Sequence, residues 1–261
     1  MPFENTNDLS FFYYSSHHKE ALARMQYAVI QRKVGVILTG DYGVGKTFVS
    51  SALMKMCLEG KCVVNFIPNP RLTPIEFIQE VNFQMGGDRV YSPATTKMDM
   101  LRSIKERLEH YFNRDLRPVL LIDEAQSITD DDLMEEIRLL LNIQADSHAL
   151  FTLILCGQPQ LEEKIEKFPQ LKQRISIRYQ LLSLDKEEVK EYIKYRLKVA
   201  GTTQNLFEET TYMHIFNLSK GMPRAINNIC DLSLLTGFIR RLDIIGDEVV
   251  LHVARDLREE S

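Results

Sequence analysis

The chain has 261 residues, of which 44% are hydrophobic and 26% are charged, and its formal net charge is −4. This length suits one large α/β domain and one small domain, and the composition is that of an ordinary globular protein. The acidic balance excludes a protein that binds nucleic acid through its overall charge, although a local basic patch would still permit DNA binding.

The cysteines and the apolar runs indicate the compartment. The cysteines form no CxxC pair and no metal-ligand spacing, which predicts reduced thiols in the core at Cys57, Cys62, Cys156 and Cys230. No apolar run reaches the roughly 18 residues that span a bilayer, and the N-terminus lacks a signal-peptide pattern. We therefore expect a soluble, cytoplasmic protein with no membrane segment.

The first two thirds of the chain alternate between helical and extended spacing of apolar residues. Helices are predicted over residues 19–33 and 49–56, from a capping box at Thr73 and Glu76 to about residue 86, over residues 101–111, and after a cap at Thr129. Strands are predicted at residues 34–40, 61–67, 118–123, 149–157 and 175–184. Because these strands are apolar on both faces, we expect a parallel five-stranded sheet flanked by helices.

Beyond Leu184 the pattern is helical only. Val189, Ile193 and Leu197 lie on one face of a helix that stops at Gly201, and further helices are predicted over residues 207–220, 223–241 and 247–258. We place the boundary near Ser183, which gives an α/β domain over residues 1–183 and a small all-α domain over residues 184–261.

A phosphate-binding motif follows the first predicted strand and precedes a helix. It fits GxxxxGK[ST], the Walker A pattern, and is formed by Gly40, Asp41, Tyr42, Gly43, Val44, Gly45, Lys46 and Thr47, with Phe48 next in the helix. The glycines let backbone amides surround phosphates, and the helix N-terminus adds a positive dipole. Lys46 is predicted to contact the β- and γ-phosphates of ATP, and Thr47 to bind Mg²⁺.

A Walker B pattern closes the third strand, where four apolar residues lead into Asp123 and Glu124. An acid at the carboxyl end of a strand in an open parallel sheet faces the ligand crevice. We expect Asp123 to orient Mg²⁺, directly or through water, and Glu124 to act as the general base that polarises the attacking water. The pattern is weak alone and strong downstream of a Walker A motif.

A competing nucleotide motif is rejected. Residues 96–99 match the [NT]KxD guanine-reading motif of GTPases, but they precede the Walker B strand and lie at a helix start. A solvated helix cap at Thr96 explains them better.

Three other positions are open to two interpretations. Gln158, after the fourth strand, either contacts the γ-phosphate or the attacking water, or is a turn residue. Arg174 and Arg178 either stabilise the transition state in a neighbouring subunit or form an ordinary surface pair, which spacing alone favours. Arg224, after Pro223 at a helix start, either contacts the phosphates or is solvated.

Together these residues resemble the ExeA/GspA family of bacterial AAA+ ATPases. The resemblance extends over nearly the whole chain, through residues 11–13, 18–22, 38–47, 121–126, 157–161, 173–175 with 178–179, and 221–227. It implies a P-loop AAA+ fold with a C-terminal helical lid, ATP and Mg²⁺ as ligands, and a homo-oligomeric ring or filament.

The resemblance also assigns roles to single residues. It implies that Gln158 is sensor 1, that Arg224 is sensor 2, and that Arg178, ahead of Arg174, is the arginine finger. It further implies that Asn69, just past the second strand, holds the catalytic glutamate in check.

Two functions fit this resemblance. The family is linked to secretion and pilus assembly, and its long members carry a membrane helix and a peptidoglycan-binding domain that this sequence lacks. The same ATPase type is similar to the TniB- and IstB-like regulators of transposition, which load onto DNA in the ATP-bound form. The expectations are thus an assembly ATPase of a secretion or pilus system, or an ATP-dependent DNA-binding adaptor of a mobile element. The net charge slightly favours the first, and a salt-dependent DNA-binding assay with and without ATP separates them.

Overall fold

The computed structural model describes residues 1–58, 60–87, 95–145, 148–202 and 204–259. The chain divides into two compact units. The sheet unit comprises residues 20–41 and 49–181, and the lid unit comprises residues 1–19, 42–48 and 182–261. The sequence did not predict that the N-terminal residues and part of the P-loop group with the C-terminal helices. The division of the chain at residue 183 itself stays a prediction.

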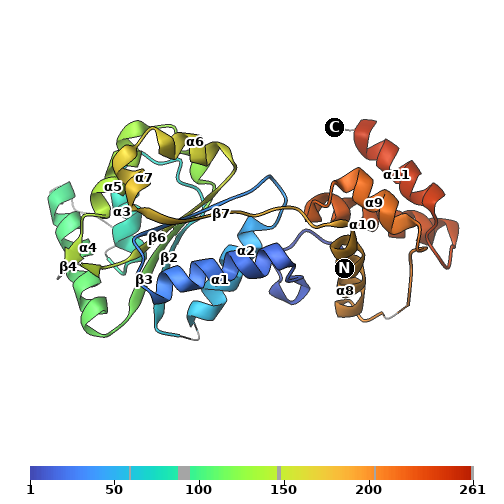
Figure 1. Ribbon diagram of the computed structural model, residues 1–261, viewed down its shortest axis with the longest axis horizontal. Coiled ribbons are helices and arrows are strands. Elements are labelled where there is room, and N and C mark those ends of the chain that lie inside the picture. Colours follow the sequence, from blue (N-terminus) through green and yellow to red (C-terminus); the bar gives the residue numbers. More distant parts are fainter. Residues whose placement is uncertain (59, 88–94, 146–147, 203, 260–261) are drawn as a thin grey trace. The chain divides into compact units, whose positions relative to one another are not determined.

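The sheet unit is built on five parallel strands, as the sequence predicted (Figure 1). The strands are β1 (Gly35–Thr39), β2 (Cys62–Ile67), β3 (Arg117–Ile122), β6 (Thr152–Gly157) and β7 (Ile175–Gln180), in the spatial order β2-β3-β6-β1-β7. Every pair in this sheet is parallel, so the carboxyl ends of all five strands lie along one edge. β6 lies between β1 and β3, as expected for the strand that ends before Gln158.

Helices cover both faces of this sheet. Their bounds are α1 (Ser16–Ile30), α2 (Lys46–Leu58), α3 (Pro74–Gln84), α4 (Lys97–Asn113), α5 (Asp131–Leu140), α6 (Gln160–Glu166) and α7 (Pro169–Arg174), with the first turns of α1 and α2 in the lid unit. Leu153 and Leu155 of β6 share one core with α3, α4 and α5. Cys156 points to the other face, where its Sγ lies 3.4 Å from Ser50 Oγ of α2. This alternation along a fully buried strand explains its continuous apolar sequence.

Helix caps confirm one sequence interpretation and correct another. Thr73 and Thr96 each form a capping box, with Glu76 and Asp99 respectively, so residues 96–99 are a helix start and not a guanine-reading motif. The prediction that Thr129 caps the next helix is wrong. Asp130 caps α5, because its carboxylate accepts the N–H of Asp132 at 2.8 Å at the positive end of the helix.

Two predicted strands are shorter than expected. Residues 149–151 do not continue β6, because β5 (His148–Ala149) pairs antiparallel with β4 (Gln144–Ala145). β7 ends at Gln180 instead of Leu184, because its one neighbour, β1, ends at Thr39, the partner of Gln180. The sequence also did not predict α6 and α7 as separate short helices.

The lid unit packs four helices around its own core. They are α8 (Lys186–Val199), α9 (Thr211–Ser219), α10 (Pro223–Arg240) and α11 (Asp247–Glu259), and a 3-10 helix, η1 (Leu9–Phe11), precedes them in the chain. Phe3 of the N-terminal segment belongs to the same core. The helix predicted from residue 207 begins only at Thr211, because Phe207 forms a β-bridge with Ile245. Among the described residues, no helix is both long and apolar enough to cross a membrane.

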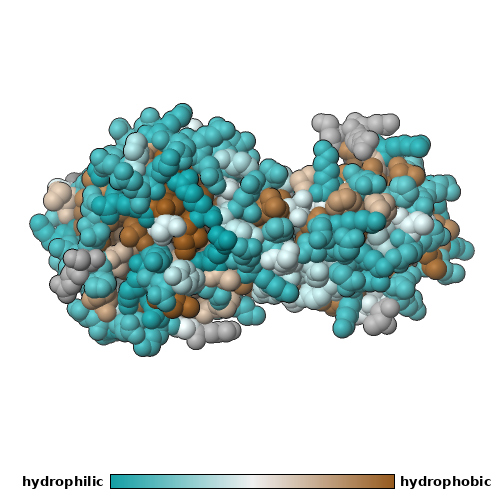
Figure 2. Space-filling model, viewed as in Figure 1, coloured by the Kyte–Doolittle hydropathy of each residue, from teal (hydrophilic) through white to brown (hydrophobic). Residues whose placement is uncertain are grey.

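The surface of the protein is mainly hydrophilic, because most apolar side chains lie in the cores of the two units. On the face drawn in Figure 2, hydrophilic side chains predominate and hydrophobic residues appear in small separate groups. The cysteines follow the prediction in part, because Cys57, Cys156 and Cys230 are buried whereas Cys62 is only half-buried.

A buried arginine fixes the N-terminal segment to the lid unit. Arg196 of α8 is 1% exposed, and its guanidinium donates to the carbonyl oxygens of Pro2 (2.6 Å) and Glu4 (2.9 Å) and to the hydroxyl of Tyr192 (2.8 Å). The Tyr192 hydroxyl in turn donates to Asn227 of α10 at 2.7 Å. Each nitrogen of the guanidinium thus donates to an acceptor, which offsets the cost of burying its charge.

We expect Arg196→Met to lower the free energy of unfolding by about 2–4 kcal/mol, because two main-chain carbonyls and a tyrosine hydroxyl lose a buried charged donor. Chemical denaturation measures the loss, and limited proteolysis should show cleavage within the first residues of the chain. Arg255→Met, which changes an exposed arginine on α11, is the control. An Arg196→Met variant as stable and as protease-resistant as the control would contradict this anchoring role.

Candidate nucleotide-binding site

The P-loop, residues 40–47, has the backbone geometry of a phosphate cradle. Gly43 and Gly45 have φ angles of +87° and +102°, which side chains rarely permit. Lys46 is the first residue of α2 and is only 6% exposed, and Thr47 follows it in the first helical turn. A loop of successive amides that ends at a helix N-terminus is suited to binding phosphate groups.

His18 of α1 holds this loop from within the lid unit. Its Nε2 lies 3.0 Å from the carbonyl oxygen of Val44, which can only accept, so Nε2 carries the proton. Its Nδ1 lies 2.6 Å from Ser15 Oγ and therefore accepts from that hydroxyl. A Cβ at Gly45 would lie 2.7 Å from His18 Nε2, so this glycine is required both by its φ angle and by the histidine.

The buried setting of His18 keeps its ring neutral. Burial lowers the pKa of His18 from 6.5 to about 4, against an opposing effect of the hydrogen bond to Val44. A neutral ring is the form that both of its hydrogen bonds require, because Nδ1 must accept from Ser15. His18 was not among the site residues predicted from sequence; the signal available was its place in the matched stretch of residues 18–22.

Arg224 holds the loop from α10, also within the lid unit. Its backbone N–H donates to the carbonyl oxygen of Gly43 at 3.3 Å, and its guanidinium carbon lies 4.7 Å from the ring centroid of Tyr42. The guanidinium also donates to the Tyr42 hydroxyl. Pro223 occupies the first turn of α10, where no amide hydrogen is needed. Arg224 thus contacts Tyr42 and Gly43 of the loop, and its predicted contact with the phosphates stays a prediction.

The carbonyl contacts orient the loop amides. A trans peptide is planar, and its C=O and N–H groups point in opposite directions. The carbonyl of Gly43 points to the Arg224 backbone, so the N–H of Val44 points away from it. The carbonyl of Val44 points to His18, so the N–H of Gly45 points away from that ring. Lid residues therefore bind the carbonyls of Gly43 and Val44, and the N–H groups of Val44 and Gly45 face the other side.

Within the sheet unit, neighbouring strand ends bring the remaining candidate residues together. The N–H of Gly40, after β1, donates to the carbonyl oxygen of Gly157, at the end of β6, at 3.2 Å. Asp123, directly after β3, is 4% exposed, and its N–H donates to Ile67 O of β2 at 2.9 Å. One carboxylate oxygen of Asp123 accepts the N–H of Glu124 at 2.9 Å. The Asp123 and Glu124 carboxylates thus lie at the carboxyl edge of the sheet, as predicted.

Gln126 joins Glu124 to the segment after β6. Its side-chain Nε2 donates to Glu124 Oε2 at 2.5 Å, and its Oε1 accepts the backbone N–H of Gln158 at 3.0 Å. The sequence matched Gln126 to the family pattern but gave it no role, because nothing in the spacing shows which groups its amide contacts.

Asn69 does not take the position that the resemblance implied. It is exposed, and its side-chain oxygen accepts the N–H of Arg71 at 3.2 Å in its own loop. Within the described ranges, the side chain bonded to Glu124 is Gln126. The side chain bonded to the glutamate in this structure therefore comes from the turn that follows β3 and not from the end of β2.

The two candidate arginine fingers differ in their settings. Arg174 donates to Leu141 O at 2.9 Å and to Asn142 Oδ1 at 2.6 Å, which satisfies the C-terminal end of α5. Arg178 on β7 has looser contacts, with guanidinium–carboxylate distances of 3.6 Å to Glu162 and 3.5 Å to Glu166 on α6. Arg174 thus binds the end of α5 in its own chain, whereas Arg178, among the residues that the structure describes, forms two longer ion pairs on the surface.

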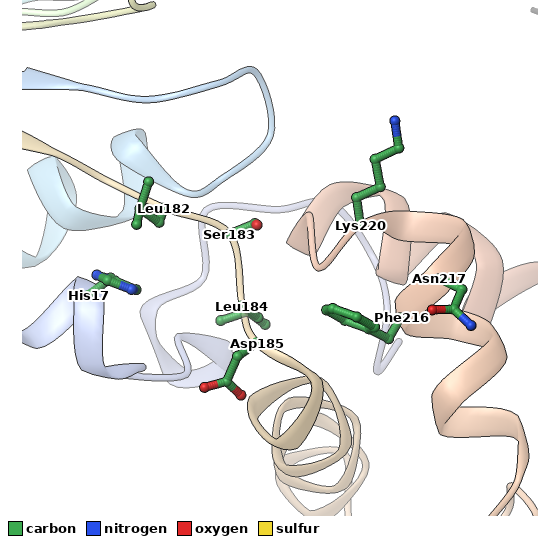
Figure 3. Close-up of a pocket in the computed structure, with 8 residues that line it drawn as sticks. All are labelled: His17, Leu182, Ser183, Leu184, Asp185, Phe216, Asn217 and Lys220. Carbon is green, nitrogen blue, oxygen red and sulfur yellow. The ribbon is translucent and has the colours of Figure 1, made fainter.

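A pocket of about 520 Å³ in the lid unit contains none of the predicted site residues (Figure 3). It is lined by His17, Leu182, Ser183, Leu184, Asp185, Phe216, Asn217 and Lys220. Figure 3 shows the Phe216 ring turned toward Leu184 and the Lys220 chain extending away from them. His17 thus lines this pocket, while its neighbour His18 binds the P-loop.

Comparison with known proteins agrees with this geometry. Residues 30–165 match the AAA domain family. The general secretion pathway protein A of Aeromonas hydrophila is 35% identical over 255 residues, which are 96% of this chain and 45% of that protein. A potential ATP-binding protein of Staphylococcus aureus is 29% identical over 53% of this chain and 49% of its own length. The chain thus spans about half the length of the curated relatives it matches.

The fold is also found in solved structures. Cdc6p from Pyrobaculum aerophilum superposes with a TM-score of 0.75 at 16% identity, over 98% of this chain and 70% of that one. At this identity the likeness concerns the fold alone, and it confirms the predicted P-loop α/β architecture with its additional helices.

We expect the free energy of unfolding to fall as the pH decreases from about 6.5 to about 4, because the unfolded chain protonates His18 in this range and the folded chain does not. The contribution reaches up to about 3 kcal/mol, given 1.36 kcal/mol per pKa unit. Denaturant titrations at several pH values measure it, and His18→Gln should flatten the dependence. The control His252→Gln, which removes an exposed histidine, should leave the slope unchanged. Equal slopes for wild type and His18→Gln would show that His18 titrates normally.

Proposed function

The chain belongs to the AAA family of ATPases, and we propose that it binds ATP with Mg²⁺ and hydrolyses it between neighbouring copies to drive assembly or remodelling of a secretion-system partner. The observation that carries this proposal is the P-loop, in which two glycines of positive φ precede a buried lysine at a helix start. A polyphosphate is bound by backbone amides together with a positive charge, and this loop offers both.

The ligand set supports Mg²⁺ as the metal. Thr47 and Asp123 are the proposed ligands, an alcohol and a carboxylate, and Mg²⁺ is typically held by one or two such protein groups together with substrate phosphates. No three His, Cys, Asp or Glu side chains converge on a metal site in the described part of the chain, so a metal held by protein ligands alone does not fit. When bound, Mg²⁺ neutralises charge on the β- and γ-phosphates.

Each residue of the proposed site has a separate proposed role. Glu124 takes a proton from the attacking water, and Gln158, after β6, orients that water or the γ-phosphate. Arg224 is proposed to exchange its contact with Tyr42 for one with the phosphates, because a guanidinium binds a phosphate more strongly than an aromatic ring. Gly40, Asp41, Tyr42, Gly43, Val44, Gly45 and Phe48 complete the proposed nucleotide-binding set.

The proposed hydrolysis requires a second copy of the chain. Arg178 is the arginine finger in this proposal, because its two ion pairs are easily exchanged for a phosphate oxygen, whereas removing Arg174 leaves the end of α5 without a donor. A positive charge supplied in trans makes turnover depend on assembly, so a ring or filament becomes the active species.

The proposed partner follows from the similarity to general secretion pathway protein A, which extends over 96% of this chain. The similarity covers both units, so it includes the lid as well as the P-loop region. We propose a protein of a secretion or pilus system as the partner, with ATP supplied from the cytoplasm.

We expect two substitutions to separate binding from turnover. Lys46→Ala should abolish ATP binding, because the phosphates lose their main cationic contact, and calorimetry measures this affinity. Glu124→Gln should bind ATP like the wild type and lose most of its phosphate release, because an amide does not accept the proton. Removal of Mg²⁺ with a chelator should also stop wild-type turnover.

The matched controls are Lys55→Ala, an exposed lysine on α2, and Glu163→Gln, an exposed glutamate on α6. Both should behave like the wild type. Unchanged ATP affinity in Lys46→Ala would refute the nucleotide site, and wild-type turnover in Glu124→Gln would refute the assignment of the base.

We expect Arg178→Ala to bind ATP normally and to lose turnover by roughly a thousandfold. A mixture of Lys46→Ala and Arg178→Ala, each inactive alone, should partly recover, because some interfaces then pair an intact P-loop with an intact arginine. Phosphate release measures the recovery, and gel filtration with ATP shows that the variants co-assemble. No recovery in co-assembled mixtures would transfer the role to Arg174, and full activity of a monomer would remove the trans-acting arginine.

A further inference from the structure

The turn that follows β3 places the side chain of Gln126 beside the Glu124 carboxylate. Glu124 has φ 52° and ψ 33°, a left-handed conformation that residues other than glycine adopt uncommonly. This turn starts a short 3-10 helix, η2 (Ala125–Ser127), whose Ser127 N–H donates to Glu124 O at 2.8 Å. The left-handed residue therefore reverses the chain and brings the side chain of Gln126 back beside that of Glu124.

The Gln126 amide is bonded at both of its ends. Nε2 donates to Glu124 Oε2 at 2.5 Å, and Oε1 accepts from Gln158 N at 3.0 Å. A carboxylate can only accept and a backbone N–H can only donate, so the bridging group must offer one donor and one acceptor a fixed distance apart. A primary amide meets this requirement, whereas a carboxylate or an alkyl chain does not.

The surrounding residues are arranged to permit this bridge. A Cβ at Gly157 would lie 2.7 Å from Gln126 Oε1, so any larger residue there would displace the amide. Lys164 of α6 donates to the backbone oxygens of Gln126, at 2.7 Å, and of Ile128. Lys164 is half-buried, and this burial lowers the pKa of its ammonium group.

We propose that Gln126 is a positioning residue for the reaction, which fixes the Glu124 carboxylate to the segment after β6 so that one oxygen is anchored and the other is left for the attacking water. This inference rests on the proposed function, because it concerns the base of that reaction. Gln126 contacts the base and the backbone of Gln158 and acts through them. The anchor links the proposed base to the proposed sensor without a contact between their side chains.

The bridge makes the position of the proposed base, Glu124, depend on the position of the proposed sensor segment at Gln158. Movement of residues 157–158 shifts the acceptor end of the amide, and the donor end then moves Glu124 Oε2. Because rates of positioned reactions fall by about 100-fold for displacements near 1 Å, a bridge of this kind has a large effect on turnover and little effect on ATP affinity.

The test is a comparison of kcat and KM for ATP in four variants. Gln126→Ala removes the bridge, and Gln126→Glu keeps its shape but replaces the donor with a second carboxylate. Gly157→Ala displaces the amide while leaving Gln126 in the sequence. Gln84→Ala is the matched control, because Gln84 Nε2 donates to Glu80 Oε1 at 2.7 Å on α3, an equivalent bond away from the carboxyl edge.

We expect kcat to fall about 10- to 100-fold in the three bridge variants with KM within about twofold of the wild type, and no change in the control. In a Glu124→Gln background, Gln126→Ala should cause no further loss, because it acts through the glutamate. Thermal unfolding identifies a variant that fails to fold, and Gln126→Glu, which preserves the shape, then decides the result.

Three outcomes would overturn the inference. Wild-type kcat in Gln126→Ala and Gln126→Glu would show that the bridge has no part in turnover. A higher kcat would show that Gln126 restrains the base, and an additional loss in the Glu124→Gln background would show that it acts elsewhere. A wild-type protein that does not hydrolyse ATP would instead refute the proposed function, and this inference would fall with it.

Discussion

β6 pairs in parallel with β1 on one side and with β3 on the other, and this pairing places the candidate site residues of the sheet unit along one edge. β1 and β6 end together, because the register pairs Thr39 with Gly157, whereas β3 ends at Ile122, opposite Leu155 and before the end of β6. Gly40 and Asp123, which follow β1 and β3, therefore lie beside the last residues of β6 although they are far apart in sequence. A slip of one residue in β3 would turn every side chain of that strand to the opposite face, which fully buried strands with different helices on each face do not permit.

The same burial explains how much of the fold could be predicted. The inner strands β1, β3 and β6 are almost wholly apolar because helices cover both faces, whereas the edge strands β2 and β7 carry polar residues such as Asn65 and Arg178. Apolar runs that alternate with helices are typical of a parallel sheet. The ends of elements were less predictable because they depend on neighbours. β7 ends at Gln180 because β1 offers no further partner, and α5 begins one residue later than expected because Asp130 competes with Thr129 as the cap. Arg196 could not be predicted as buried, because its acceptors are backbone carbonyls of Pro2 and Glu4.

The candidate site likewise contains residues that the sequence predicts and residues that it does not. Motif spacing predicts Lys46, Thr47, Asp123 and Glu124, because phosphate and Mg²⁺ binding require those residue types at a loop and at a strand end. Gln126 could not be assigned in this way. Its contact with Glu124 depends on the left-handed conformation of Glu124 itself, and its contact with Gln158 depends on the missing side chain of Gly157. Both conditions are properties of the backbone after folding. The position of Asn69 just past β2 likewise did not determine its contacts. Its side-chain oxygen accepts the N–H of Arg71 in its own loop.

The P-loop connects the proposed nucleotide to the lid unit through single peptide groups. The carbonyls of Gly43 and Val44 are bonded by the Arg224 backbone and by His18, and the planarity of those peptides turns the following amides to the opposite side. A ligand that binds these amides therefore contacts the same two peptide groups as the lid residues, which bind the carbonyls. Rotation of either plane would weaken both sets of hydrogen bonds together, so ligand affinity and the contacts of α10 and α1 are energetically linked, and the linkage is reciprocal. The neutral, buried ring of His18 suits this task, because it donates to the loop without adding a charge beside Lys46, the lysine proposed to bind phosphate.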